Sequence, residues 1–211
     1  MTNLTTLLAL ADSRLPTGGH VHSGGVEEAV TEGLVGDVRT LRAYLVRRVR
    51  THGLVAASIA AAVHGGALTV DGADRETDAR TPAPAARAAS RAQGRGLARL
   101  ARRVWPGHDW GALGRTPHLP VVAGVVGEVS GLTAEQTATS LVYTTMTGTA
   151  TAAQRLLALD PGDVAALTFE LSALCDDVAR AAAKELADLS DPLLDVLAER
   201  HRARERPLFA S

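Results

Sequence analysis

The 211-residue chain carries a formal net charge of −1 and is 46% hydrophobic but only 3% aromatic, so its core must be built from Ala, Leu and Val. This composition favours close-packed helices within one domain. The single Cys175 excludes an intramolecular disulfide and fits a reducing, cytoplasmic compartment, while the apolar stretch Leu7–Ala11 is too short to span a membrane and lacks the basic lead of a signal peptide.

The first predicted element is a short helix around Leu7–Ala11, which ends before Pro16 because proline removes a backbone donor and disfavours helix in the preceding residue. Two glycine pairs follow, Gly18-Gly19 and Gly24-Gly25. Glycine pairs permit positive φ or very close backbone approach. Acidic residues at Glu27 and Glu28 then mark the first turn of a second helix.

The loop between these helices admits three interpretations. His20 and His22 could bind a metal, but a structural site needs about four ligands and no nearby cluster supplies the rest. A glycine loop can also cradle phosphate, but the P-loop pattern is absent and the chain has one lysine, Lys184. The spacing by itself favours a tight turn packed under its neighbours.

Residues 38–63 predict two successive helices. Val38, Leu41, Leu45 and Val49 lie on one face of an amphipathic helix, and the stretch 54–63 is apolar all round until Gly65-Gly66 ends it. His52 and His64 lie near the ends of this second stretch, where we expect partly buried, hydrogen-bonded side chains rather than metal ligands.

Residues 70–81 are polar and turn-rich, which predicts an irregular excursion before a helix that starts after Pro82 and Pro84. That helix carries an arginine ridge at a spacing of four, Arg87, Arg91, Arg95 and Arg99. The ridge could bind nucleic-acid phosphates, but the near-neutral charge and the scarcity of aromatic residues oppose this alternative. Gly94 and Gly96 within the helix predict a close neighbour.

The second half of the chain predicts four further helical regions. Residues 121–129 suit a strand as well as a helix, and we favour a helix because no strand partner is evident. Thr133 and Gln136 form a capping box that opens a long helix to Leu159, rich in small residues that let a second helix approach inside the fold or across a dimer. Near its end, we expect Arg155 to have an acidic or carbonyl partner.

We expect Asp163 to cap the next helix, whose buried stripe extends to Leu186. The last helix is expected to start at Ser190-Asp191-Pro192. Arginines are concentrated at 39–50 and 87–103, and acids at 160–199. This segregation predicts either arginine faces that meet acidic faces within the fold or separate charged surfaces for different partners.

The segment from Leu15 to Glu27, LPTGGHVHSGGVE, resembles the signature of the UreF family of urease accessory proteins. Arg155-Leu156 and the closing Pro192, His201 and Leu208-Phe209-Ala210-Ser211 follow in the order and spacing of that family, so the resemblance covers nearly the whole chain. Three positions depart from the pattern: His20 replaces an aromatic residue, Arg202 an acid, and Pro207 an arginine.

The resemblance implies an all-α fold, a single-domain compact multi-helix bundle over residues 1–211. It implies a non-enzymatic urease maturation scaffold that works with UreD/UreH-type and UreG-type accessory proteins on apo-urease, with a homodimer within the complex. In the family, the UreG-type protein is the GTPase and the assembly inserts nickel. The chain has no P-loop, no zinc-type ligand set and no nucleophile with an evident base, which agrees with no cofactor or metal site of its own and no nucleic-acid or membrane partner.

The residues that match the family's motifs are the candidate partner-binding residues: Pro16, Gly18, Gly19, His20, His22, Ser23, Gly24, Gly25, Glu27, Arg155, His201, Leu208 and Phe209. We hypothesise that the tail, 201–211, is mobile in the isolated protein and becomes ordered on the UreD-type partner, because the charged run before Leu208 has little reason to pack on its own helix. A nucleic-acid binder using the arginine ridge and a metal-handling enzyme using His20, His22, His52 and His64 remain the alternatives.

Overall fold

The computed structural model describes residues 4–17, 22–204 and 208–209, which form helices and loops without a β-strand, so the predicted all-α class is confirmed. The elements are α1 (Leu4–Leu10), α2 (Val26–Thr31), α3 (Val38–Arg48), a π-helical turn η2 (Val49–Gly53), α4 (Leu54–His64), α5 (Val70–Ala79), α6 (Pro84–Val104), a 3₁₀ turn η3 (Gly111–Leu113), α7 (Leu119–Val129), α8 (Ala134–Leu157), α9 (Pro161–Glu170), α10 (Ser172–Ala182) and α11 (Pro192–Arg202).

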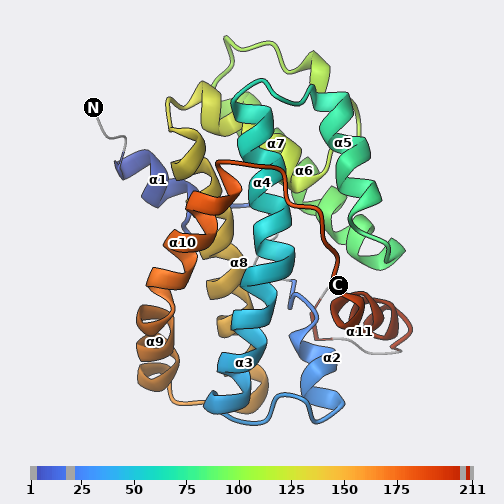
Figure 1. Ribbon diagram of the computed structural model, residues 1–211, viewed down its shortest axis with the longest axis vertical. Helices are drawn as coiled ribbons and strands as arrows, with labels where there is room; N and C mark the ends of the chain where they lie inside the picture. The colour runs from blue at the N-terminus through green and yellow to red at the C-terminus, as the bar shows by residue number, and fades with distance from the viewer. Residues whose placement is uncertain (1–3, 18–21, 205–207, 210–211) are drawn as a thin grey trace.

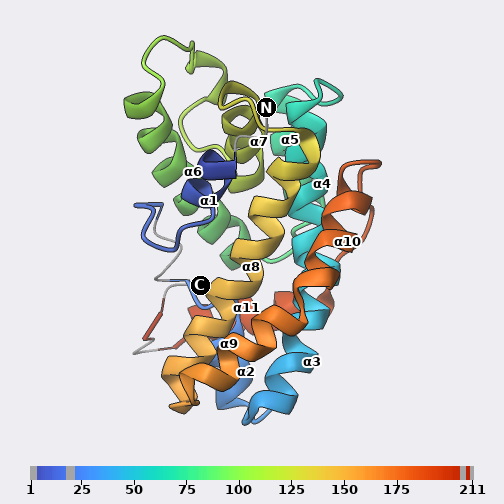
Figure 2. The same cartoon turned by 90° about the vertical axis from the view of Figure 1, so that its left-hand side faces the viewer.

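A long rod made of α3, η2 and α4 runs the length of the molecule, with α8 packed along it (Figure 1). Helices α5, α6 and α7 surround the α4 half of the rod, whereas α2, α9 and α11 surround the α3 half. After α10 the chain crosses α4, where the Ala187 N–H donates to Ser58 Oγ at 3.0 Å, and then forms α11 beside α2. The side view shows α1 lying near α8 (Figure 2). The fold therefore brings the last helix back onto the second.

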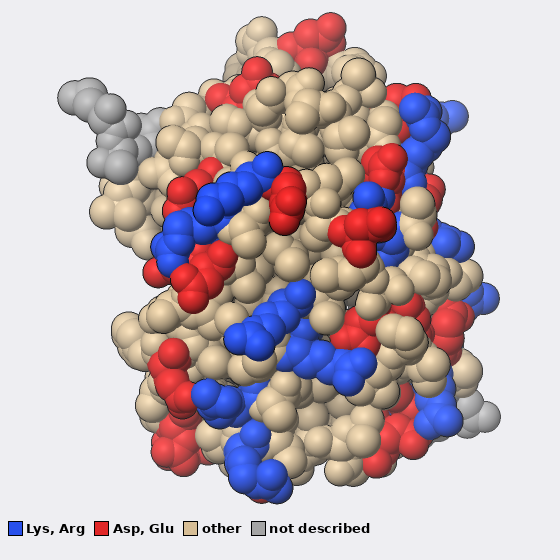
Figure 3. Space-filling view, viewed as in Figure 1, with Lys and Arg blue, Asp and Glu red and all other residues tan. Residues whose placement is uncertain are grey.

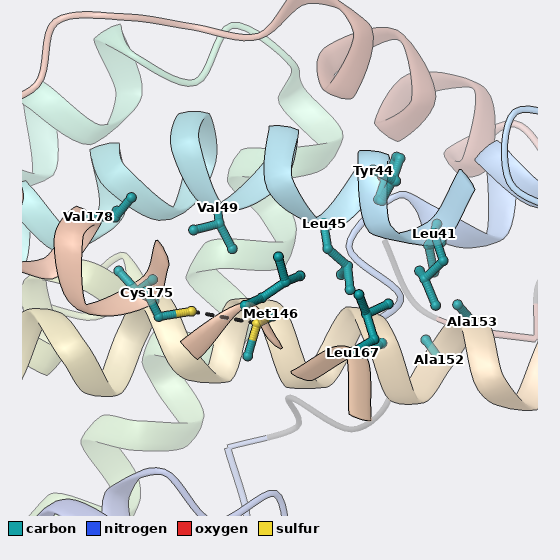
Figure 4. Packing of buried hydrophobic residues seen from close by; sticks show 14 of the residues in the cluster. Leu41, Tyr44, Leu45, Val49, Met146, Ala152, Ala153, Leu167, Cys175 and Val178 are labelled. Atoms are coloured by element: carbon teal, nitrogen blue, oxygen red, sulfur yellow. Dashed lines mark hydrogen bonds between the residues drawn. The ribbon is translucent and has the colours of Figure 1, made fainter. Parts of the chain in front are cut away.

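The two halves of the rod have separate hydrophobic clusters. In the α3 half, Leu41, Leu45 and Val49 pack against α8, α9 and α10, and Cys175 Sγ lies 3.5 Å from Met146 Sδ (Figure 4). Around α4 the packing depends on small residues: a Cβ at Gly124 of α7 would lie 2.6 Å from Ala60 O. Few aromatic residues are needed because the backbones approach this closely.

Several predicted boundaries are confirmed. Thr133 forms a capping box with Gln136 at the start of α8, and residues 121–129 lie within the helix α7. Asp191 caps α11, with Pro192 at its first turn, where the missing N–H costs no intrahelical bond. These boundaries are set by residues close in sequence, and they match the structure to within two residues.

Two predictions were wrong. Residues 70–81 are largely helical, because Thr69 caps α5 through the Gly72 N–H and charged pairs four residues apart, such as Asp71 with Arg75, support its exposed side. In the later segment, Asp160 rather than Asp163 is the cap, and the expected single helix is divided into α9 and α10 at Leu171.

The segregated charges meet within the fold. Arg42 Nε donates to Glu170 at 2.7 Å, and Arg47 forms two hydrogen bonds with Asp191, at 2.6 and 2.7 Å. On the face shown in Figure 3, arginines and acidic side chains are interspersed. Of the two possibilities the sequence left open, these pairs support opposite charges that meet inside one domain. Within the described residues, no helix is both long and apolar enough to cross a lipid bilayer.

Candidate partner-binding site

The second glycine pair has the unusual backbone that its sequence predicts. Gly24 and Gly25 have φ of 64° and 84°, in the left-handed region that other residues rarely adopt. A Cβ at Gly24 would lie 2.6 Å from Arg48 Cζ, and one at Gly25 would lie 2.9 Å from Tyr44 Oη. The Tyr44 hydroxyl donates to Gly24 O at 2.9 Å. The loop is therefore fixed against the α3 helix by close contacts that only glycine allows.

Glu27, in the first turn of α2, is the centre of the site. It is 3% exposed, and its carboxylate accepts hydrogen bonds from His201 Nε2 at 2.7 Å, from the Leu208 N–H at 2.8 Å and from the Phe209 N–H at 3.0 Å. His201 lies on α11 and is 2% exposed. One buried carboxylate thus joins the glycine loop, the last helix and the C-terminal segment.

The protonation of Glu27 follows from these contacts. Burial raises the pKa of its carboxyl, but the hydrogen bonds from the Leu208 N–H, His201 and the Phe209 N–H outweigh burial, and the net shift is downward. Glu27 is therefore ionised at neutral pH. An ionised buried carboxylate needs its donors, so the contact between α2 and the C-terminal segment is coupled to the charge of this one residue.

A second layer of charge pairs surrounds Glu27. Arg204 Nη1 lies 3.1 Å from Glu28 Oε2 and also reaches the Thr31 hydroxyl, and Arg200 Nη1 lies 2.9 Å from Glu32 Oε1. The argument for a mobile tail was that the charged run 201–206 has little reason to pack on its own helix. Arg204 of this run instead contacts another helix, α2. The ordering of the tail on a partner stays a prediction.

Leu208 and Phe209 differ in their surroundings. Phe209 packs against the hydrophobic cluster of the α3 half, whereas Leu208 is 79% exposed. Glu27 holds the backbone N–H of both residues. The result is an apolar side chain presented to solvent on a backbone that is fixed from inside.

An open cavity of about 600 Å³ lies beside this junction and brings further predicted residues together. Its lining includes His22, Gly24, Gly25, Arg155 and Phe209. The expected partner of Arg155 is not found: this residue is exposed and makes no hydrogen bond or ion pair with any described residue. It instead faces the cavity from the end of α8.

The remaining predicted site residues are distributed differently. Ser23 is fully buried next to the glycine pair, and Pro16 is exposed in the loop after α1. Gly18, Gly19 and His20 lie outside the described residues. Sequence reasoning missed Tyr44 and Arg48, which hold the loop; their spacing of four on an amphipathic helix was the available signal.

Comparison with known proteins agrees with this architecture. The UreF family model matches residues 35–172. Over the full length of both chains, this protein is 83% identical to the urease accessory protein UreF of Mycobacterium sp. (strain JLS) and 69% identical to that of Mycobacterium bovis (strain BCG / Pasteur 1173P2). The chain belongs to the UreF family. It also shares 73% identity, again over both full lengths, with the urease accessory protein UreF of Mycolicibacterium vanbaalenii (strain DSM 7251 / JCM 13017 / BCRC 16820 / KCTC 9966 / NRRL B-24157 / PYR-1).

Among its described residues, this UreF-family chain has one group of three side chains that could hold a metal ion: Asp74, Asp78 and His118. Arg91 already occupies it, donating to Asp74 at 2.9 Å and to Asp78 at 2.8 Å, while His118 Nε2 lies 2.9 Å from Asp78. A guanidinium between the carboxylates neutralises the charge that a cation would need. The cluster therefore serves to join α5, α6 and the start of α7.

The histidines of the metal-handling alternative are dispersed. His64 Nε2 lies 2.7 Å from Leu132 O, whereas His22 and His52 line the cavity. Within the described part of the chain, none of these three belongs to a group of three potential ligands. The arginine ridge is divided as well, because Arg87 and Arg91 pair with Asp78 while Arg95 and Arg99 are exposed.

Proposed function

We propose that this protein is a non-catalytic scaffold for urease maturation in the cytoplasm. It binds UreD/UreH-type and UreG-type accessory proteins, as one copy of a homodimer, and positions them on apo-urease. In this assembly the UreG-type protein hydrolyses GTP, and nickel is the cargo delivered to urease. The chain itself contributes shape and binding surface.

The observation that carries the proposal is the full-length identity to proteins named urease accessory protein UreF. The geometry adds a surface suited to protein partners. The glycine loop, α2 and the C-terminal segment are joined through Glu27, and Leu208 projects from that junction with 79% of its surface exposed. A fixed backbone that presents an apolar side chain loses little conformational entropy on binding, which favours affinity.

Leu208 is accordingly the proposed anchor for the UreD-type partner. Deleting Arg206–Ser211 is an ambiguous test, because it also removes two hydrogen bonds to the buried Glu27 and should lower the melting temperature. Leu208→Ala removes the exposed side chain and keeps both N–H groups. It should change the free energy of unfolding by less than about 0.5 kcal/mol.

The experiment is co-expression of urease and its accessory proteins with the wild-type or variant chain. Two quantities are then measured: the affinity of the chain for the UreD-type protein, and the specific activity of the purified urease. We expect Leu208→Ala to weaken the complex about tenfold, since a well-packed leucine contributes about 1.5 to 3 kcal/mol. The matched control is Val104→Ala, another exposed aliphatic residue at the far end of α6.

Val104→Ala should bind and activate like wild type. If Leu208→Ala also binds the UreD-type protein with unchanged affinity, the C-terminal segment is not the docking surface. If the wild-type chain supports no urease activation and binds none of the accessory proteins, the scaffold function itself is wrong.

A further inference from the structure

Arg48, the last residue of α3, has no hydrogen-bond or ion-pair partner among the residues that the structure describes. Its Nε atom is enclosed by protein and makes no hydrogen bond to any of them. Gly24 covers part of the guanidinium, so a Cβ there would lie 2.6 Å from both Cζ and Nη2. A guanidinium nitrogen enclosed by protein is normally hydrogen-bonded, because an enclosed polar group without a partner is costly.

The neighbouring groups do not supply the missing partner. Asp191 is close enough to influence Arg48, but its carboxylate is held by two bonds from Arg47 and one from the Thr51 hydroxyl. Burial lowers the pKa of Arg48, and the nearby charge of Asp191 only partly offsets this. The fold therefore keeps a positive charge in a site that disfavours it.

The site also holds neutral hydrogen-bonding groups. Burial, together with the charge of Arg48, lowers the pKa of His52 to about 3, so its imidazole is neutral at physiological pH. The buried Ser23 hydroxyl, next to Gly24 in the chain, likewise has no hydrogen-bond partner in the described part of the chain. Gly24 therefore lies between two such groups, the Ser23 hydroxyl that precedes it in the chain and the Arg48 Nε that packs against it.

The backbone explains why Arg48 faces open space. The π-helical turn Val49–Gly53 follows Arg48 directly, and such turns widen the helix and often occur at functional sites. Arg48, Thr51 and His52 all line the open cavity of about 600 Å³. Gly148 of α8 also lines this cavity and has no atom within 4 Å of its would-be Cβ. Space for a ligand therefore adjoins the guanidinium.

From this arrangement we propose that Arg48 is the centre of an oxyanion site that takes a carboxylate group in the cavity lined by Gly24 and Gly25, η2 and α8. A carboxylate matches the fork of a guanidinium with two parallel hydrogen bonds. The neutral His52 ring offers a further hydrogen bond. The group is either a free small carboxylate or a carboxylate side chain of a partner protein.

The free ligand is tested with acetate on the purified full-length protein at pH 7, with ionic strength held constant by sodium chloride. A ligand that binds the native state raises the melting temperature in a saturable way. We expect this rise in wild type and its loss in Arg48→Met, which keeps the length of the side chain without its charge. Arg50→Met, an exposed arginine two residues along, should keep the full response.

The partner's carboxylate is tested by measuring the affinity of the variants for the UreD-type and UreG-type proteins. This second experiment rests on the proposed function, whereas the acetate experiment does not. The carboxylate belongs to a partner protein if acetate has no effect and Arg48→Met binds that partner at least tenfold more weakly. Arg50→Met must then bind it like wild type. The proposal is overturned if acetate has no effect and both variants bind all partners equally. It is also overturned if acetate stabilises wild type and Arg48→Met alike.

Discussion

Two buried histidines, His118 and His201, sit on carboxylates in different halves of the molecule, and their surroundings are opposite in kind. Around His118, the Ser90 hydroxyl lies 3.0 Å from Nδ1, and Arg91 bridges Asp74 and Asp78. That cluster compensates its own charges.

Around His201, the carboxylate of Glu27 holds a C-terminal segment whose Leu208 side chain is exposed, and Gly24 covers Arg48, which has no partner among the described residues. Under the proposed function, this difference predicts that the surroundings of His118 serve stability and those of His201 serve binding. Polar groups that are fully satisfied inside the fold have nothing left to offer a partner. An apolar side chain left exposed, or a polar group left without a partner, lowers the stability of the isolated protein. Contact with a binding partner can bury the first and supply a hydrogen bond to the second.

Replacing each histidine by alanine tests this division most strongly. His118→Ala and His201→Ala both remove an imidazole that is at most 2% exposed and leave a carboxylate with fewer donors. Each should lower the free energy of unfolding by about 3 to 5 kcal/mol, measured by denaturant titration.

Their effects on binding should differ. At a temperature where both variants remain folded, His118→Ala should bind the UreD-type protein with wild-type affinity, whereas His201→Ala should bind it at least tenfold more weakly. Equal losses of affinity in both variants would mean that the two halves are not functionally distinct.

The glycines of the two halves provide a smaller test. A Cβ at Gly94 would lie 2.2 Å from the backbone oxygen of Pro117, next to His118, so the backbone must shift; Gly94→Ala should cost about 2 to 3 kcal/mol. A Cβ at Gly24 meets the end of the Arg48 side chain, which can move more readily, so Gly24→Ala should cost about 1 to 2 kcal/mol for its positive φ.

Gly33→Ala is the matched control for this test, because Gly33 also has a positive φ, of 72°, but no atom within 4 Å of its would-be Cβ. It should lose stability like Gly24→Ala in thermal unfolding. Only Gly24→Ala should weaken partner binding, since only it displaces Arg48. Wild-type binding by Gly24→Ala would argue against a role for the loop contact.

The smallest expected effect is a pH dependence that arises beside Arg48. The pKa of His52 is lowered to about 3 in the folded protein, below the ordinary value of 6.5, so the unfolded state binds an extra proton between these values. Stability from this residue is complete above pH 6.5 and is lost as the pH falls, by up to about 1.4 kcal/mol per pH unit.

His52→Gln should reduce that slope between pH 6.5 and 5 in denaturant titrations. His64→Gln is the comparison, because His64 lies at the far end of α4 from His52, with its Nε2 2.7 Å from Leu132 O. An unchanged slope in His52→Gln would show that the pKa of His52 is not lowered in the folded protein.

The sequence by itself determined the helical class and most helix boundaries. Thr133 with Gln136, and Asp191 with Pro192, act through backbone groups within three residues, so their effect can be read from local spacing. It also indicated the left-handed backbone at Gly24 and Gly25, because few other residues allow it. The family resemblance came from the same short-range motifs.

Tertiary structure alone decided what those motifs contact. Glu27 and His201 are separated by 174 residues, and no periodicity predicts that a carboxylate in one helix will bind an imidazole in another. Which of the arginines 42, 47 and 48 has an acidic partner depends on which helix packs against each side of α3. Pairing and burial are set by long-range packing, whereas capping and turn formation act within a few residues, and the candidate site depends on the former.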